Sequence, residues 1–177
     1  QVDGNNEHLW MFDRDGYRRD TPEAGLDAWA ADVRAQGHEP RQEVDVSIAE
    51  PSPVVAGLLR LSEGDPIVIR RRLRLVDDVP YQTADSHYPM WVAQGTDIMM
   101  PGDVTIPGGL MRAAGHPQVR FTDQLTGRMA TDLDVMRMDL PRITPVFEHV
   151  RTGFNADDAA VRVIVTISPT DRTRILF

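Results

Sequence analysis

The stretch IVIRRRLRLVDDVPYQTADSHYP, residues 67–89, constrains the fold more than any other part of the chain. Two runs of β-forming character, 67–76 and 81–88, are joined by the tetrapeptide DDVP. Because aspartate and proline are typical turn residues, this pattern predicts a β-hairpin.

The first predicted strand contains an unusual number of arginines. Side chains alternate between the two faces of a strand, so one face would present Val68, Arg70, Arg72 and Arg74. The opposite face is mostly apolar, with Arg71 as its exception, and is expected to contact the core. The second predicted strand offers one acid, Asp85. Its alternate face is neutral and able to form hydrogen bonds, with Gln82, Ala84, Ser86 and Tyr88.

This arginine-rich face has three interpretations: a nucleic-acid stripe, a solvated sheet face, or a pocket for a small anion. The chain has a net charge of −8, which disfavours nonspecific binding to phosphate backbones. All of its basic residues are arginine, so arginine content alone does not argue for phosphate recognition. Guanidinium groups bind carboxylate and phosphate in a bidentate manner. The residues alone leave the solvated face and the anion pocket both open.

The rest of the chain interleaves helix and strand signals. Helices are expected from Thr21-Pro22-Glu23 to Gly37, and over 52–61, 108–115 and 131–138. Strands are expected around 44–48, over 119–129, 145–154 and 160–167, and in the closing DRTRILF. Hairpins dominate over long crossover helices, which predicts an α+β domain with a largely antiparallel sheet. A chain of 177 residues suits one such domain.

Several classes of function lack support in the sequence. There is no cysteine, the five histidines are dispersed, and no nucleotide-binding or nucleophile motif occurs. No apolar run is long enough to span a membrane. We therefore expect no metal site, no cofactor, no catalytic residues and no membrane partner, and a cytoplasmic location. Trp91 and the pair Met99–Met100 are expected in the core.

The segment LRLSEGDPIVIRRRLRLVDDVPYQTADSHYP resembles the signature of the UTRA domain. This is the effector-binding and dimerisation half of HutC-type transcription regulators in the GntR superfamily. The segments PGGLMRAAG, LTGRMAT, TPVFEHVRTGFNADDAAV and SPTDRTRILF follow in the family's order. The resemblance implies a fold like that of chorismate lyase, with helices flanking an antiparallel sheet and a small-molecule cavity at the sheet.

The resemblance also implies a domain organisation and partners. Residues 1–20 would be an interdomain linker with a short extended piece around Leu9–Phe12, and residues 21–177 would be the UTRA domain. A winged helix-turn-helix domain, absent from this chain, would precede the linker and bind operator DNA. The implied partners are a small anionic effector and a second copy in a homodimer. The implied protein is a regulator, expected to be a repressor, in which effector binding shifts the arrangement of the DNA-binding domains.

The resemblance gives candidate ligand-binding residues, with some departures from the family. An R-x-R pair that binds the anionic group in sugar-phosphate-responsive relatives matches Arg72 and Arg74, and a hydroxyl residue matches Ser86. Two acids of the family fall at Ala84 and Arg162, and a tyrosine falls at Ser168. The predicted ligand-binding residues are Arg72, Arg74, Ser86, Tyr88, Arg162 and Ser168.

Losing two carboxylates and gaining an arginine favours a more anionic or less hydroxylated ligand than a sugar phosphate. Two rival hypotheses remain open. A dimerisation domain that lost its ligand would have its strand arginines neutralised by protein acids such as Asp85. A lyase-like enzyme is suggested by the shared fold alone, which is a weak argument for chemistry.

Overall fold

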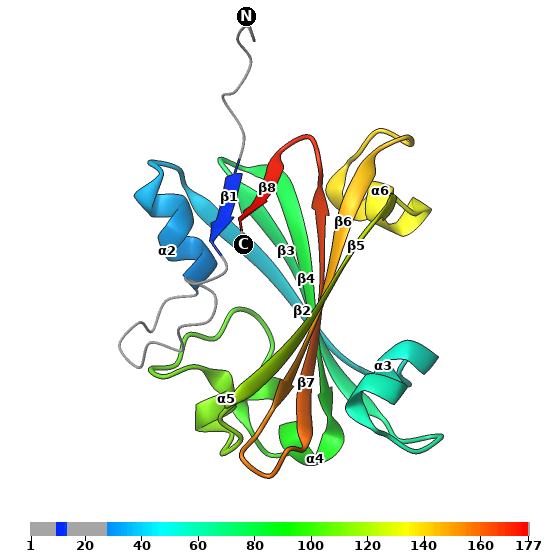
Figure 1. The fold of residues 1–177 in the computed structure, drawn as a ribbon. Coiled ribbons are helices and arrows are strands. Elements are labelled where there is room, and N and C mark those ends of the chain that lie inside the picture. Colours follow the sequence, from blue (N-terminus) through cyan, green and yellow to red (C-terminus); the bar gives the residue numbers. More distant parts are fainter. Residues whose placement is uncertain (1–9, 14–27, 177) are drawn as a thin grey trace, which may run out of the picture.

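A six-stranded antiparallel sheet forms the centre of the molecule (Figure 1). The computed structural model describes residues 10–13 and 28–176. Along the sheet the strands are β2 (Pro40–Ala49), β3 (Ile67–Val76), β4 (Val79–Pro89), β7 (Ala160–Pro169), β6 (Pro145–Phe154) and β5 (Arg120–Met129). Every neighbouring pair of strands is antiparallel. The predicted α+β class with a largely antiparallel sheet is confirmed.

The two ends of the chain meet in a separate two-stranded sheet. β1 (Trp10–Asp13) pairs in parallel with β8 (Thr173–Leu176). The extended piece expected near Leu9–Phe12 thus corresponds to β1, apart from Leu9, which lies outside the described residues. The remainder of the predicted linker lies outside them as well.

Short helices connect and cover the strands. They are α2 (Ala28–Ala35), α3 (Pro53–Leu59), α4 (Met90–Ala93), the 3₁₀ helix η1 (Asp97–Met99), α5 (Leu110–Ala113) and α6 (Asp132–Met138). The predicted start of the first helix at Thr21 lies outside the described residues. Helix α3 begins as expected for its sequence: the Ser52 hydroxyl accepts a hydrogen bond from the Val55 amide, and Pro53 is at the first helical position. Helices α4 and η1 lie in a stretch for which the sequence analysis expected no helix.

The hairpin of β3 and β4 turns at Asp77 and Asp78. Both have positive φ, 50° and 63°, as a two-residue type I′ turn requires, and Val76 pairs directly with Val79. The turn is therefore shorter than the predicted DDVP, and Val79 and Pro80 belong to β4. The register shifts after Arg74, so Tyr81 is the extra residue of a bulge.

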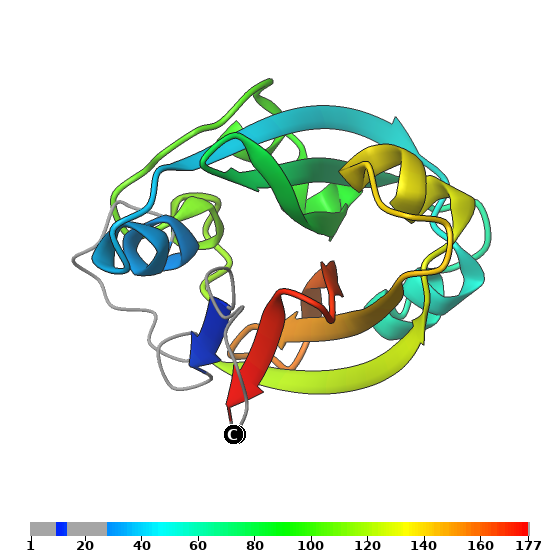
Figure 2. The same cartoon turned by 90° about the horizontal axis from the view of Figure 1, so that it is seen from above.

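Helices cover both faces of the sheet. In Figure 1, α2 and α5 lie on one side and α3 and α6 on the other. Apolar residues of α3 and α6 pack against the face of β3 that carries Ile67, Ile69 and Leu73. The opposite face carries Val68, Arg70, Arg72, Arg74 and Val76, and packs against α2, α4 and α5. Seen from above, the sheet curves strongly (Figure 2).

The arginine face is therefore buried. Arg70, Arg72 and Arg74 are only 1%, 9% and 5% exposed, so the interpretation of a solvated sheet face is wrong. The expectation that Trp91 and Met100 belong to the core is also wrong, because they are 53% and 52% exposed. Met99 does pack against the core cluster that contains Val68.

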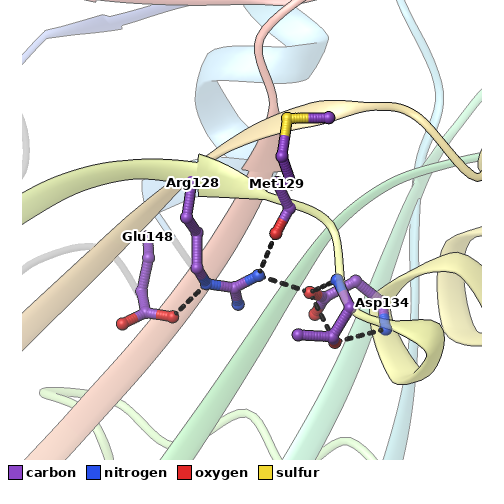
Figure 3. A network of polar contacts seen from close by, with 5 residues as sticks. Arg128, Met129, Asp134 and Glu148 are labelled. Atoms are coloured by element: carbon purple, nitrogen blue, oxygen red, sulfur yellow. Dashed lines mark hydrogen bonds and ion pairs between the residues drawn. The ribbon is translucent and has the colours of Figure 1, made fainter.

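A network of ion pairs fixes the start of α6 to the sheet (Figure 3). Thr131 and Asp134 form a capping box at the helix N-terminus. Arg128, at the end of β5, donates to the Asp134 carboxylate at 2.7 Å and to the Glu148 carboxylate of β6 at 2.7 Å. Burial alone would raise the pKa of Asp134, but hydrogen bonds from Arg128 and Thr131 hold it below its ordinary value. Arg128 thus ties two strands and a helix together.

We expect Arg128→Met to lower the free energy of unfolding by about 1–3 kcal/mol, because hydrogen bonds to charged groups contribute about that much when shielded from water. Chemical denaturation measures the effect. Arg142→Met is the matched control, since Arg142 pairs with Asp132 of the same helix at 3.7 Å but both side chains are almost fully exposed. Equal stabilities of the two variants would contradict a structural role for the network.

Candidate functional site

A cavity of about 370 Å³ lies on the arginine face of the sheet. The sheet contributes Gln42, Arg72, Arg74, Tyr88 and Arg162 to its wall. Helix α2, residues of the segment 103–112, which includes the start of α5, and Pro40, Pro117 and Gln118 complete the wall. Cavities that hold small molecules have volumes of about 300–1,000 Å³, so this one suits a small metabolite.

The cavity is strongly basic. Its lining includes five arginines, Arg34, Arg72, Arg74, Arg112 and Arg162. Among the described residues that line it, Asp103 is the one acid. Arg34 on α2 and Arg112 on α5 are exposed, whereas the sheet arginines lie deeper. A wall of this composition favours an anionic guest.

Two of the deep arginines meet at a single hydroxyl group. Arg72 Nη1 donates to Ser86 Oγ at 2.9 Å. From β7, Arg162 donates to the same oxygen through Nη2 at 2.8 Å and Nε at 3.2 Å. The register places Ser86 opposite Arg70 on β3 and Ile164 on β7, between the two arginine strands. Ser86 therefore positions both guanidinium groups, although it is not among the residues that line the cavity.

The third deep arginine is held by an amide and an indole ring. Arg74 Nη1 donates to Gln82 Oε1 at 2.9 Å, and Gln82 Nε2 donates to Ser168 Oγ at 2.8 Å. The Arg74 guanidinium lies 4.8 Å from the centre of the Trp29 ring, within the range of a cation–π contact. Ser168 thus supports Arg74 through Gln82 and is not among the cavity-lining residues.

Tyr88 adds a phenol group to the same wall. It is fully buried, and its hydroxyl oxygen makes no hydrogen bond of good geometry to any described residue. The Arg162 guanidinium lies 5.6 Å from the centre of its ring. Burial alone would raise the pKa of the phenol, but the neighbouring Arg162 and Arg72 lower it below its ordinary value. The lowered pKa reports a positive potential at this end of the cavity.

Of the six predicted residues, the structure brings Arg72, Arg74, Tyr88 and Arg162 to one cavity wall, and puts Ser86 and Ser168 directly behind them. The sequence did not identify Arg34 and Arg112. Arg112 was within the family segment PGGLMRAAG, but only the packing of α5 against the sheet brings it to the cavity. Arg34 appeared as an ordinary polar residue of a helix.

The two remaining arginines of β3 have structural partners. Arg70 donates to three backbone carbonyls, those of Ile98 at 2.9 Å, Met100 at 2.6 Å and Gly102 at 2.7 Å. Burial, followed by repulsion from Arg72, lowers its pKa. Arg71, on the opposite face, donates to Ser47 Oγ at 2.6 Å. Arg70 therefore anchors the chain at the point where the cavity wall 103–112 begins.

We expect Arg70→Met to destabilise the protein by about 3 kcal/mol or more, because each buried acceptor left without a donor costs about 1–3 kcal/mol. Hydrogen exchange should show that the amides of 98–112 lose protection before those of the sheet. Arg71→Met removes the same group from the other face of β3 and is the control. Uniform loss of protection across the sheet and the segment would contradict a local anchoring role.

Asp85, which precedes Ser86 in the sequence, forms its ion pair away from this site. Asp85 accepts two hydrogen bonds from Arg137 of α6, at 2.6 and 2.8 Å, on the face of β4 away from the cavity.

No group of three described His, Asp or Glu side chains is arranged to hold a metal ion. Among the described helices, none has the length and apolar character needed to cross a membrane.

Comparison with known proteins gives a consistent family. Residues 35–174 match the UTRA domain family. No curated protein matches the chain significantly. The effector domain of PhnF from Mycobacterium smegmatis has a similar structure, with a TM-score of 0.72, 19% identity, and coverage of 87% of this chain and 95% of that one.

Two further solved structures share the fold. The C-terminal domain of Yurk from Bacillus subtilis has a TM-score of 0.68 and 21% identity, with coverage of 76% of this chain and 92% of that one. A GntR-family transcriptional regulator from Bacillus cereus has a TM-score of 0.68 and 14% identity, with coverage of 78% and 96%. These likenesses confirm the predicted chorismate-lyase-like fold of GntR effector domains. Since the family match spans most of the sequence, the chain belongs to the UTRA domain family.

Proposed function

We propose that this UTRA domain senses a small anionic effector in the arginine-lined cavity, as part of a HutC-type, GntR-family transcription regulator. The observation that carries the proposal is the charge of the cavity wall, to which the described residues contribute five arginines and one aspartate. Arg72 and Arg74 would bind the anionic group, supported by Ser86 and Ser168 and assisted by Tyr88 and Arg162. The protein would have no catalytic activity of its own.

Burial explains why these arginines suit a sensing role. A buried guanidinium group has lost much of its hydration, so a bound anion recovers electrostatic energy that water no longer supplies. The group that accepts a hydrogen bond from Arg72 is the Ser86 hydroxyl, which carries no charge. Binding of an anion would therefore be strongly favourable at this wall.

The proposed regulation follows from linkage. An effector shifts the balance between two arrangements of a protein only by its difference in affinity for them. In the proposed regulator, a homodimer of UTRA domains (residues 21–177) would transmit this shift through the linker 1–20 to winged helix-turn-helix domains on operator DNA. We propose a repressor, whose DNA affinity depends on the occupied cavity.

One observation favours a sensing domain over a dimerisation domain that has lost its ligand. The latter predicts that protein acids such as Asp85 neutralise the arginines of β3. In the structure Asp85 pairs with Arg137 on the other face of the sheet.

The proposal predicts selective stabilisation by anions. In a thermal-shift screen, organic acids and phosphorylated metabolites should raise the melting temperature, whereas neutral polyols should not. An effector at one hundred times its Kd should add about 2.7 kcal/mol to the free energy of unfolding. Arg72→Met and Arg74→Met should each weaken binding by about tenfold to a hundredfold, because each removes a charge-assisted hydrogen bond.

Arg71→Met provides the control for these variants. It removes an arginine from the same strand, but on the opposite face, and should leave effector affinity unchanged. Stabilisation by a neutral polyol with no response to anions would refute the proposal. Equal loss of affinity in Arg71→Met and Arg72→Met would also count against it.

A further inference from the structure

We propose that Gln118 determines which neutral polar group the cavity accepts beside the negative charge of its guest, and that Gly153 is the positioning residue that makes room for Gln118. The group that Gln118 would bind is a hydroxyl carried close to a carboxylate or a phosphate. The inference rests on the proposed function, because it assumes that the cavity binds an anion.

The first argument is a glycine within β6. Glycine weakens a strand and often marks a close approach of another group, and Gly153 lies inside this strand. Its φ is not positive, so the backbone conformation does not require glycine. A Cβ atom at this position would lie 2.6 Å from Gln118 Cδ and 2.7 Å from both Gln118 Oε1 and Nε2, which is too close for a real side chain. The missing side chain of Gly153 therefore makes room for the Gln118 amide.

The second argument is the orientation of the amide. Its carbon, oxygen and nitrogen atoms are almost equally distant from the Cβ position of Gly153, so the amide group lies flat over the strand. Gln118 lines the cavity and is half-buried. Within the part of the chain that the structure describes, its amide forms no hydrogen bond. The carbonyl and the N–H groups of the amide are therefore available to a guest.

The backbone around Gln118 is fixed on both sides. At the end of α5, the His116 amide donates to the Met111 carbonyl at 2.8 Å. The Val119 amide donates to the Phe154 carbonyl at 2.8 Å, and β5 begins at the next residue. Gln118 therefore has a defined position, which a residue that selects a ligand requires.

The third argument is the chemistry of the amide. Guanidinium groups only donate hydrogen bonds, whereas a carboxamide donates and accepts, as a hydroxyl group also does. Gly153 pairs across the sheet with Arg162, and directly paired residues share a face, so the Gln118 amide lies beside an arginine of the cavity wall. The arginines of the wall would repel a cationic amine. A hydroxyl group next to the anionic group of the guest therefore fits this position best.

Two pairs of small anions test this selection at constant charge. Malate, as either enantiomer, differs from succinate by a hydroxyl group, and glycerol 3-phosphate differs from propyl phosphate in the same way. At pH 8 both members of each pair carry the same charge, since the second pKa of a phosphate monoester is about 6. NMR titration of the 177-residue chain measures the dissociation constants, including those of weakly bound probes.

We expect the wild-type protein to bind at least one hydroxylated probe about fivefold more tightly than its deoxy partner, because one neutral hydrogen bond contributes about that factor. Preference within the carboxylate pair would identify a hydroxy acid as the natural class, and preference within the phosphate pair a hydroxylated phosphate ester. Gln118→Met keeps the length of the side chain and removes the amide. It should abolish the preference and leave the affinity for the deoxy probe within about twofold of the wild-type value.

Gly153→Ala tests the positioning role. Its Cβ atom would displace the amide, so the preference should fall as in Gln118→Met, and adding Gly153→Ala to Gln118→Met should not change the preference further. Gly127→Ala is the matched control, because Gly127 lies within β5 and a Cβ atom there would meet nothing within 4 Å. Circular dichroism would confirm that the variants are folded, and Gln118→Met carries the test alone if Gly153→Ala is not.

Equal affinities within both pairs in the wild-type protein would overturn this inference and leave the proposed function standing. A preference that survives in Gln118→Met would show that another residue binds the hydroxyl, and would overturn the inference as well. Failure of all these anions to bind would overturn the proposed function itself.

Discussion

The burial of three arginines on one face of β3 is the constraint on which the rest of the structure depends. A buried cation is costly unless its N–H groups find acceptors. The domain meets this need with uncharged groups: backbone carbonyls for Arg70, the Ser86 hydroxyl for Arg72 and the Gln82 amide for Arg74. For Arg70 and Arg72 these acceptors are neutral, so hydrogen bonds are supplied while the positive charge of the two side chains is left in place. Under the proposed function, this difference separates a cavity that binds an anion from an internal salt bridge.

The same strand therefore has a structural arginine and a cavity-lining arginine at two-residue spacing. Arg70 is enclosed by three carbonyls of the segment 98–102 and fixes one edge of the cavity wall. Arg72, two residues further along, faces the cavity itself. Alternation along a strand brings both to one face. Their roles differ because the segment 98–102 covers the side chain of Arg70, whereas the side chain of Arg72 lines the cavity.

The sequence predicted the sheet well because its hairpins depend on local signals. The alternation in β3, the aspartates of the turn and the capping residues of α3 and α6 are all readable within a few positions. The cavity was predicted less completely. Arg34 and Arg112 reach it only because α2 and α5 pack on the arginine face, and no local pattern encodes that packing. The burial of Arg72 could not be predicted from the pattern either, because an alternating strand with charged residues normally indicates one solvated face. Family resemblance, rather than periodicity, singled out Arg162.

Ser86 illustrates how a small residue can determine the character of a site without touching the ligand. Its position on β4, between β3 and β7, makes it the neighbour of arginines from both strands. A carboxylate there would form internal ion pairs with Arg72 and Arg162 and compete with any anionic guest. A residue with an apolar side chain would leave the same N–H groups without an acceptor in the empty cavity. A hydroxyl does neither, because it orients the two guanidinium groups and adds no negative charge of its own. Under the proposed function, the affinity of the cavity for anions would therefore depend on a residue outside its lining as much as on the arginines within it.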